Sequence, residues 1–326
     1  MPTGVNPPLV PLGALSPLRS RPAVRNFLEA PPLTPGDLSM VLLVTEEPTD
    51  CRMPTVTVER IPAVMHDAAA LGIRSVKLFA ESEVRDSTGE ISLAPDSLMA
   101  RAVSAAKGAE STLAIMTETC LCAYTETGAC YLTDRHGRPD VAATVNVTAM
   151  QAVAHANAGA DIVGPASMML ATTRGTRIAL NENGHGSVSV MPHVIFHSSL
   201  YDGYRLTMGA TPRMGVDREF QISASKPNQF IEAALELVEY GADMLLLEPA
   251  LFCADVLVAL KSRTLVPVLP FSVSGEYTML SRTDTETGKR ETGTLAGLFT
   301  MLKRAGADAS ITYAALEIAR ALQDRG

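Results

Sequence analysis

Residues 305–313 read Ala-Gly-Ala-Asp-Ala-Ser-Ile-Thr-Tyr, and this stretch contains one of four copies of a pattern that decides the fold. Each copy follows a helical-looking segment rich in Ala, Leu or Val and precedes an apolar run. A glycine suits the left-handed residue just past a helix end. The apolar run behind it predicts a buried parallel strand. The other three copies are Leu71-Gly72-Ile73-Arg74, Ala158-Gly159-Ala160-Asp161 and Tyr240-Gly241-Ala242-Asp243.

Working outward from these copies, the whole chain alternates apolar runs with helical segments. Such alternation indicates a parallel sheet, and eight repeats suit an α/β fold of the (β/α)8 TIM-barrel type, typically about 250 residues long. The eight predicted strands are 40–45, 75–80, 113–117, 161–165, 188–192, 244–248, 267–272 and 309–313. The predicted helices are 61–71, 95–109, 144–158, 174–181, 227–240, 252–263 and 294–305.

Residues 1–35 precede the first repeat and are predicted to form an extended N-terminal arm, with the barrel domain spanning 36–326. The arm contains several prolines and the basic residues Arg19, Arg21 and Arg25. Two interpretations remain open for it: a segment that packs on a neighbouring subunit, or a mobile chain end.

Composition excludes several classes of protein. The chain has 326 residues, 47% of them hydrophobic, with a net charge of −8, which predicts a folded acidic protein. No lysine- or arginine-rich run suggests a nucleic-acid partner. No apolar run reaches the length of a membrane span, and the first residues do not resemble a secretory signal. We therefore expect a cytoplasmic protein whose thiols stay reduced.

Three of the five cysteines, Cys120, Cys122 and Cys130, fall within eleven residues after the third predicted strand. If the chain there is extended, Cys120 and Cys122 point to the same side, and Cys130 can return after a loop. A disulfide is the alternative, but cysteines separated by one residue pair poorly. Three thiolates suit a soft or borderline metal and leave one coordination position free for chemistry. The cluster therefore predicts a metal site at the C-terminal end of the barrel, where barrel enzymes carry their chemistry.

These strand ends resemble those of one family. Residues 119–125, Thr-Cys-Leu-Cys-Ala-Tyr-Thr, look like the zinc loop of porphobilinogen synthase, also called 5-aminolevulinate dehydratase. Residues 273–277 and 311–313 resemble its seventh and eighth strand ends, and the resemblance runs from about Arg21 to Leu322. It implies a zinc enzyme with a (β/α)8 barrel and an N-terminal arm, built from arm-embracing dimers up to an octamer. The family joins two molecules of 5-aminolevulinate into porphobilinogen.

Two positions depart from the family pattern. The family forms Schiff bases from two lysines, and the matching positions here hold Ile195, counted back from Tyr201 and Arg205, and Glu248, in Leu246-Leu247-Glu248-Pro249. A Schiff base needs a primary amine, which neither isoleucine nor glutamate has. The resemblance therefore predicts a diverged member.

The residues that hold substrate carboxylates in the family are retained. By resemblance, Arg205 and Gln221 would bind one substrate, and Ser274 and Tyr313 the other. An arginine suits a carboxylate because its donors can form two parallel hydrogen bonds. A second family arginine should lie near Arg218, but the spacing is one residue off.

Three residues are candidates for acid–base chemistry: Glu248, His193 and His197. Glu248 could be a fourth zinc ligand, a general base, or a carboxylate paired with Arg205 or another cation in an inactive site. Each histidine could move protons near neutral pH or be a packed core residue.

Other polar residues have weaker interpretations. Lys77, the only lysine within a predicted strand, could be a relocated amine. Glu276 could hold Mg²⁺ or contact another subunit, as in some family members. His136, His155 and His185 are expected on loops or helix surfaces.

Three functions remain open from the sequence. The first is a diverged zinc lyase, of condensing or dehydrating type, that acts on a small amino- or keto-carboxylic acid without lysine chemistry. The second is a genuine porphobilinogen synthase of tetrapyrrole biosynthesis. The third is a catalytically silent paralogue that regulates such an enzyme. In each case we expect a homo-oligomer, from dimer to octamer, formed through the arm.

Overall fold

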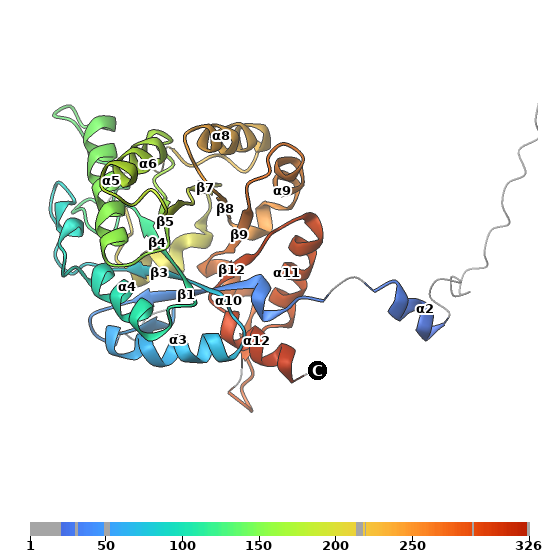
Figure 1. Ribbon diagram of the computed structural model, residues 1–326. Coiled ribbons are helices and arrows are strands. Elements are labelled where there is room, and N and C mark those ends of the chain that lie inside the picture. The colour runs from blue at the N-terminus through green and yellow to red at the C-terminus, as the bar shows by residue number, and fades with distance from the viewer. Residues whose placement is uncertain are drawn as a thin grey trace, which may run out of the picture. The chain divides into compact units, whose positions relative to one another are not determined.

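A computed structural model describes residues 21–29, 32–48, 53–212, 218, 220–288 and 290–324 (Figure 1). The chain divides into two compact units, Met1–Pro32 and Leu33–Gly326. Within the described part of the first unit, the short helix α2 (Pro22–Phe27) has no buried residue. The second unit contains the sheet and all the residues discussed as a site below.

The second unit is a barrel of parallel strands. Its strands follow the order β6-β5-β4-β3-β1-β12-β9-β8-β7. The first and last strands of this order, β6 and β7, are consecutive in the chain and flank Met191 and Pro192, so together they act as one strand that pairs with β5 on one side and β8 on the other. This double pairing closes the sheet into eight strand positions. The strands are β1 (Leu38–Val44), β3 (Ser75–Ala80), β4 (Ala114–Thr119), β5 (Ile162–Pro165), β6 (Ser189–Val190), β7 (His193–Ile195), β8 (Leu245–Glu248), β9 (Val268–Ser272) and β12 (Ser310–Thr312).

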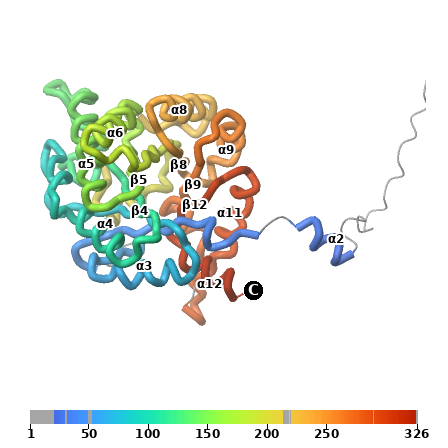
Figure 2. The backbone as a smooth tube through the Cα atoms, in the orientation of Figure 1, coloured from blue at the N-terminus to red at the C-terminus, as the bar shows by residue number. Residues whose placement is uncertain are grey.

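Helices surround the sheet, as the tube view shows (Figure 2). The seven helices expected from the sequence are present, with ends shifted by up to three residues. They are α3 (Ile61–Ala70), α4 (Leu98–Ala109), α5 (Val141–Asn157), α6 (Ala171–Glu182), α8 (Pro227–Glu239), α9 (Ala254–Lys261) and α11 (Gly293–Ala305). The structure adds elements that the sequence did not predict: α7 (Asp202–Thr207), α10 (Ser274–Leu280), α12 (Ala315–Gln323), a short strand β2 (Thr55–Val56) and the hairpin β10–β11 (Arg282–Thr283 and Arg290–Glu291).

The predicted (β/α)8 barrel is confirmed, and the fifth strand shows one difference. The sequence predicted that this strand ends at Pro192. The chain instead continues to Ile195. Pro192 still accepts, with its carbonyl oxygen 3.1 Å from Leu246 N, while Met191 N donates to Val163 O at 2.9 Å.

The repeated glycine pattern explains how the chain turns from each helix into the next strand. The glycines of the four copies have φ values of 84°, 109°, 97° and 109°, as predicted. In three copies an aspartate follows, two residues after the glycine. Its carboxylate accepts a backbone N–H from the first or second residue of a neighbouring strand at 2.8 Å and pairs with a helix cation. These sets are Asp161 with Ile115 N and Lys107, Asp243 with Val190 N and Arg177, and Asp308 with Val268 N and Lys261.

Side chains alternate along each strand, and this alternation decides which residues face the barrel interior. Phe79 of β3 has its ring 6.0 Å from that of Phe271 and 5.2 Å from that of Tyr204, so it faces inward. Lys77, two residues earlier on the same face, must face inward as well. Its side chain is wholly buried. None of the described helices is long and apolar enough to span a membrane.

Candidate functional site

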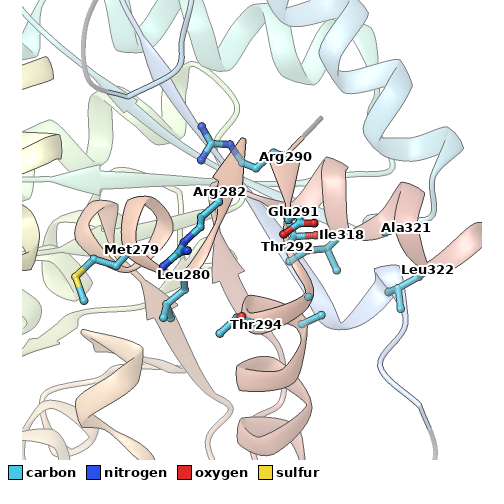
Figure 3. Close-up of a pocket in the computed structure, with 12 residues that line it drawn as sticks. Met279, Leu280, Arg282, Arg290, Glu291, Thr292, Thr294, Ile318, Ala321 and Leu322 are labelled. Carbon is cyan, nitrogen blue, oxygen red and sulfur yellow. The ribbon is translucent and has the colours of Figure 1, made fainter. Parts of the chain in front are cut away.

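The carboxyl ends of the strands surround a small cavity of about 60 Å³. A cavity of about 730 Å³ lies elsewhere, between the end of α10, the β10–β11 hairpin and α12 (Figure 3). The charged groups in its lining are Arg282, Arg290 and Glu291. The small cavity is the better candidate because all three clustered cysteines, a histidine and two glutamates line it. Such convergence of metal-ligating and titratable groups at barrel strand ends is typical of active sites.

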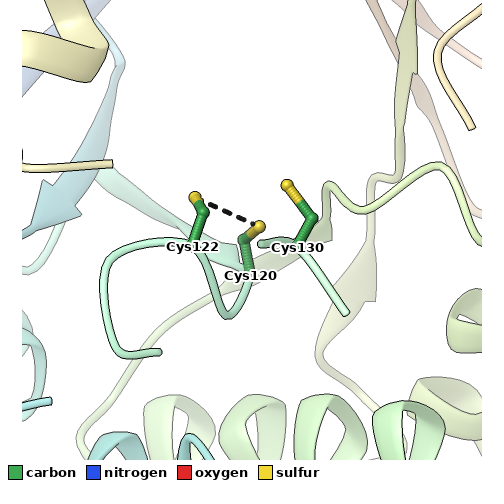
Figure 4. A group of neighbouring side chains, drawn as sticks. All are labelled: Cys120, Cys122 and Cys130. Atoms are coloured by element: carbon green, nitrogen blue, oxygen red, sulfur yellow. Dashed lines mark hydrogen bonds between the residues drawn. The ribbon is translucent and has the colours of Figure 1, made fainter. Parts of the chain in front are cut away.

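The three cysteines come together as the sequence predicted (Figure 4). Cys120 follows β4 directly, and Cys122 and Cys130 lie on the loop behind it. Their three Sγ atoms all lie within 4.8 Å of one another, and the Cys120 thiol donates to Cys122 Sγ at 3.4 Å. A tetrahedral ion with sulfur ligands at about 2.3 Å sets its sulfurs roughly 3.8 Å apart, so small rotations would bring the three thiolates onto one ion. This cluster can hold a metal ion.

The electrostatics of the cluster favour one ionised sulfur. Hydrogen bonds from the Cys120 and Cys122 thiols hold the pKa of Cys130 well below its usual value, and the Arg218 guanidinium acts in the same direction. Arg218 donates to Cys130 Sγ and, at 2.8 Å, to Ala210 O. Arg218, whose assignment was open from the sequence, therefore lies against the sulfurs of the cysteine cluster, where its charge offsets that of an ionised thiol.

His193 and Glu248 form a buried pair at the floor of the cavity. The pairing of β7 with β8 places His193 opposite Leu246 and Ile195 opposite Glu248, all on the interior face. His193 Nδ1 lies 2.8 Å from Glu248 Oε1. Burial raises the pKa of Glu248 to about 8 and lowers that of His193 well below its usual value. His193 is therefore a neutral imidazole beside a carboxyl group that titrates near neutrality. Glu248 does not join the cysteine cluster, so the interpretation of it as a fourth metal ligand is not supported.

Two further buried titratable residues, Glu118 and Lys77, interact electrostatically with Glu248. Glu118 of β4 accepts a hydrogen bond from the Tyr204 hydroxyl at 3.0 Å, and burial raises its pKa to about 8. Lys77 donates to Thr117 O at 3.3 Å. Burial lowers the pKa of Lys77 to about 8, against the opposing effect of Glu118 and Glu248. Lys77 does not line the cavity, so the side chain interpreted as a possible relocated amine is not exposed to it.

Three of the four predicted carboxylate-binding residues line the cavity: Arg205, Gln221 and Tyr313. The Arg205 side chain is 13% exposed and donates to Asp202 Oδ1 at 3.2 Å. Gln221 Oε1 is buried and has no hydrogen-bond partner among the described residues. Ser274 differs, because it lies outside the lining. Its hydroxyl donates to Leu200 O at 3.0 Å and accepts from Tyr204 N at 2.9 Å, which ties α10 to α7.

Three other expectations need correction. His197 is exposed and lies outside the cavity lining, and its backbone N–H donates to Ile222 O at 2.7 Å. Glu276 is buried, and its carboxylate accepts Leu251 N and Val273 N at 2.6 Å each, so it supports internal loops and offers no surface magnesium ligand. His155, expected on a surface, is buried with Nδ1 3.0 Å from Thr117 Oγ1.

Comparison with known proteins matches this barrel and its strand ends to one family. The model of the family described as Delta-aminolevulinic acid dehydratase matches residues 15–321. This chain belongs to the delta-aminolevulinic acid dehydratase family. The Escherichia coli K12 enzyme of that name is 32% identical over 314 residues, covering 93% of this chain and 95% of that protein. The Halalkalibacterium halodurans enzyme is 28% identical and covers 94% of this chain and 96% of its own length.

A solved structure of the family has the same fold. The delta-aminolevulinic acid dehydratase of Toxoplasma gondii, in complex with its reaction product porphobilinogen, superposes with a TM-score of 0.86 at 29% identity. The match covers 94% of this chain and 93% of that chain. Membership in a family of condensing lyases therefore holds over nearly the whole chain.

The sequence interpretation missed Glu118 as a site residue. It lies directly after the third predicted strand, 113–117, and two residues before Cys120. A carboxylate at a barrel strand end is a signal that could have identified it.

Proposed function

We propose that the protein is a zinc-dependent lyase, of condensing or hydro-lyase type, acting on a small amino- or keto-carboxylic acid without a lysine Schiff base. The observation that carries this proposal is the composition of the cavity floor. His193, Ile195 and Glu248 occupy the ends of β7 and β8, and no lysine is among the described residues that line the cavity. Lys77 is wholly buried and does not line the cavity.

The proposed substrate class follows from the groups at the cavity. Arg205 can bind a carboxylate with two parallel hydrogen bonds, and the unpartnered Gln221 Oε1 can accept from an N–H or O–H of the same molecule. Tyr313 adds a hydroxyl beside them. The Toxoplasma gondii relative was solved with porphobilinogen, a small molecule, which supports a small-molecule substrate here.

The metal proposed for the cysteine cluster is zinc. Three thiolates with no fourth His, Cys, Asp or Glu ligand among the described residues suit a zinc ion that keeps one open position. When bound, such an ion supplies Lewis-acid polarisation of a carbonyl or acidification of a water. Arg218 partly offsets the negative charge of the thiolates.

Acid–base chemistry is assigned to the pair His193–Glu248. A base works best when its pKa lies near the operating pH, and burial brings Glu248 to about 8. The imidazole, held at Nδ1 by the carboxyl group, can pass a proton between the cavity and Glu248.

Borohydride trapping tests this proposal. The purified chain is incubated with 5-aminolevulinate and sodium borohydride, and peptides are mapped by mass spectrometry, alongside elemental analysis for zinc. We expect about one zinc per chain and no adduct on any lysine. A reduced adduct on a lysine, or a protein that takes up no zinc when it is offered, would contradict the proposal.

A second candidate, a genuine porphobilinogen synthase, is favoured by family membership and by one observation. Burial lowers the pKa of Lys77 to about 8, which is the direction that makes a lysine amine nucleophilic. In this case the trapped adduct should map to Lys77, and incubation with 5-aminolevulinate should yield porphobilinogen.

We further propose that residues 1–35 form an arm that joins copies of the chain, with the barrel spanning 36–326. The helix α2 has no buried residue, and Phe27 and Leu28 are 84% and 54% exposed. Light scattering of the full chain and of a chain lacking residues 1–35 tests this. A full chain that is monomeric, or an unchanged mass after truncation, would contradict it.

A further inference from the structure

Two segments that are far apart in the sequence both line the cavity and pack on each other. One is the cysteine loop, residues 120–130, which follows β4 and contains the three clustered sulfurs. The other is the α7 segment, residues 202–212, which contains α7 and Arg205. A Cβ added to Gly128 of the cysteine loop would lie only 2.6 Å from Thr211 O. A side chain at residue 128 would therefore collide with the α7 segment, so the two backbones are in direct contact.

Arg85, on the loop after β3, joins these two segments by hydrogen bonds. Its Nη1 donates to Cys122 O at 3.1 Å and to Thr125 O at 3.4 Å, both in the cysteine loop. Its Nη2 donates to Met208 O at 3.3 Å, directly after α7. Because the guanidinium group is planar and rigid, the two nitrogens fix the acceptors on either side relative to each other. Arg85 is therefore a bridge between the cysteine loop and the segment that carries Arg205.

The surroundings of Arg85 suit this bridge. The side chain is half-buried, and it forms no ion pair with any described residue. Gly209, with a φ of 57°, leaves room for the guanidinium, since a Cβ there would lie 2.7 Å from Arg85 Nη2. A cation also suits the end of α7, because the last carbonyl groups of a helix lack intrahelical partners. Arg85 does not line the cavity, so it acts on a ligand there only through the residues that it holds.

Arg218 forms a second bridge between the same two segments. It donates to Cys130 Sγ and, at 2.8 Å, to Ala210 O, and Ala210 N donates to Arg205 O at 2.8 Å. Arg218 itself lines the cavity and contacts a sulfur, so its replacement would alter the site directly. Arg85 contacts backbone oxygens alone, so it can be removed without changing any side chain proposed to bind metal or substrate.

We propose, building on the zinc and carboxylate sites of the proposed function, that Arg85 is a positioning residue for both. It holds the cysteine loop and the end of α7 in one geometry, which prepares the three thiolates for a metal ion and Arg205 for a substrate carboxylate. Replacing residues that hold metal ligands from behind commonly lowers metal affinity about tenfold to a hundredfold. Preorganised groups bind more tightly because less conformational freedom is lost on binding. Loss of Arg85 should therefore weaken both binding events.

Two affinities of Arg85→Met test this role. Zinc affinity is measured by competition with a chromophoric chelator, and 5-aminolevulinate affinity by calorimetry on the zinc-saturated protein. Each should fall about tenfold. The matched control is Arg177→Met, because Arg177 also joins two segments through backbone oxygens, Val188 O at 3.1 Å and Gly241 O at 3.4 Å, outside the cavity lining. This control should keep both affinities.

The absorption spectrum of the cobalt(II)-substituted protein adds a readout of sulfur geometry. The sulfur-to-cobalt absorption should differ from wild type in Arg85→Met and match wild type in Arg177→Met. If Arg85→Met does not fold by circular dichroism, Arg85→Lys decides. Lysine keeps the positive charge, but its single ammonium group cannot reproduce the fork that spans both segments, so both affinities should still fall.

Wild-type affinities in Arg85→Met, or in Arg85→Lys where that variant decides, would overturn the inference. Equal losses in Arg85→Met and Arg177→Met would overturn it as well, because they would reflect general destabilisation. A loss confined to one of the two ligands would contradict a role for Arg85 in both sites. A wild type that binds no zinc, or no 5-aminolevulinate, would overturn the proposed function together with this inference. A wild type that binds both, with an Arg85→Met that binds both equally well, would overturn this inference alone.

Discussion

The two ends of the barrel use carboxylates in opposite ways. At the N-terminal ends of the strands, Asp161, Asp243 and Asp308 repeat one arrangement, each with a strand N–H and a helix cation. Their side chains are 38–47% exposed. Inside the barrel toward the other end, Glu248 is 4% exposed and hydrogen-bonds to a neutral histidine. Lys77 of β3 is wholly buried as well.

This difference separates structural charges from functional ones. A half-exposed carboxylate with a backbone donor and a cation costs little and fixes the turn from helix to strand. A buried carboxyl group without a direct cationic partner costs stability and shifts its pKa. Proteins retain such costly groups mainly where chemistry needs them, so the barrel's interior is the region to perturb.

The largest effect is expected at the cysteine cluster, at the carboxyl end of the barrel. Cys122→Ala removes one of three sulfurs, so we expect loss of bound zinc and a fall in activity on the order of 10³-fold, with the barrel still folded. Elemental analysis and circular dichroism provide the measurement. Cys253→Ala is the matched control, since Cys253 is buried and donates to Pro249 O at 3.0 Å outside the cluster. Activity that survives complete loss of metal would remove the Lewis-acid role.

A pH series on Glu248 should give the next largest effect. Its folded pKa of about 8 lies above the usual value of 4.5, so its contribution to stability is fully present below about pH 4.5 and is lost as pH rises through 8. Glu248→Gln should therefore gain about 3 kcal/mol relative to wild type between pH 5 and pH 8 in urea unfolding of the metal-free protein.

The control for this series is Glu59→Gln. Glu59 is exposed, and a hydrogen bond from its own backbone lowers its pKa, so it stays ionised at both pH values. Its effect on the free energy of unfolding should be the same at pH 5 and pH 8. A pH-independent difference for Glu248→Gln would mean that the buried carboxyl group is ionised throughout.

The sequence was sufficient for the barrel but not for all of the site. The four glycine copies and the apolar runs predicted the strands, because those signals are local. The cysteine cluster was also local, within eleven residues. The His193–Glu248 pair was not, since its partners are 55 residues apart and meet only through the register of β7 and β8.

Errors arose where tertiary contacts decide the environment of a residue. His155 looked like a helix-surface residue, but its helix faces Thr117 and buries the ring. Ser274 matched a family pattern, and its hydrogen bonds to Tyr204 N of α7 and to Leu200 O could not be predicted from that pattern. Burial and hydrogen-bond partners of this kind have no signature in a single sequence.

Substitution of one arginine at each end of the barrel tests whether only the carboxyl end binds a carboxylate. Arg205→Ala should weaken binding of 5-aminolevulinate, used as a carboxylate probe in calorimetry, by about tenfold to a hundredfold, because a charged hydrogen-bonded contact is worth roughly 1.5–3 kcal/mol. Arg177→Ala, whose arginine pairs with Asp243 away from the cavity, is the control and should bind the probe as wild type does. Equal effects from both variants would remove the carboxylate assignment of Arg205.

The smallest effect is expected at the N-terminal end of the barrel, with Asp308→Asn. The amide oxygen can still accept from Val268 N, so the variant loses chiefly the charge of the partly exposed pair with Lys261, worth about 0.5–1 kcal/mol in urea unfolding. Asp67→Asn, in a more exposed pair at 3.4 Å, should cost close to nothing. Neither variant should change metal content or probe binding. A change in either property for Asp308→Asn would mean that the two ends of the barrel are coupled.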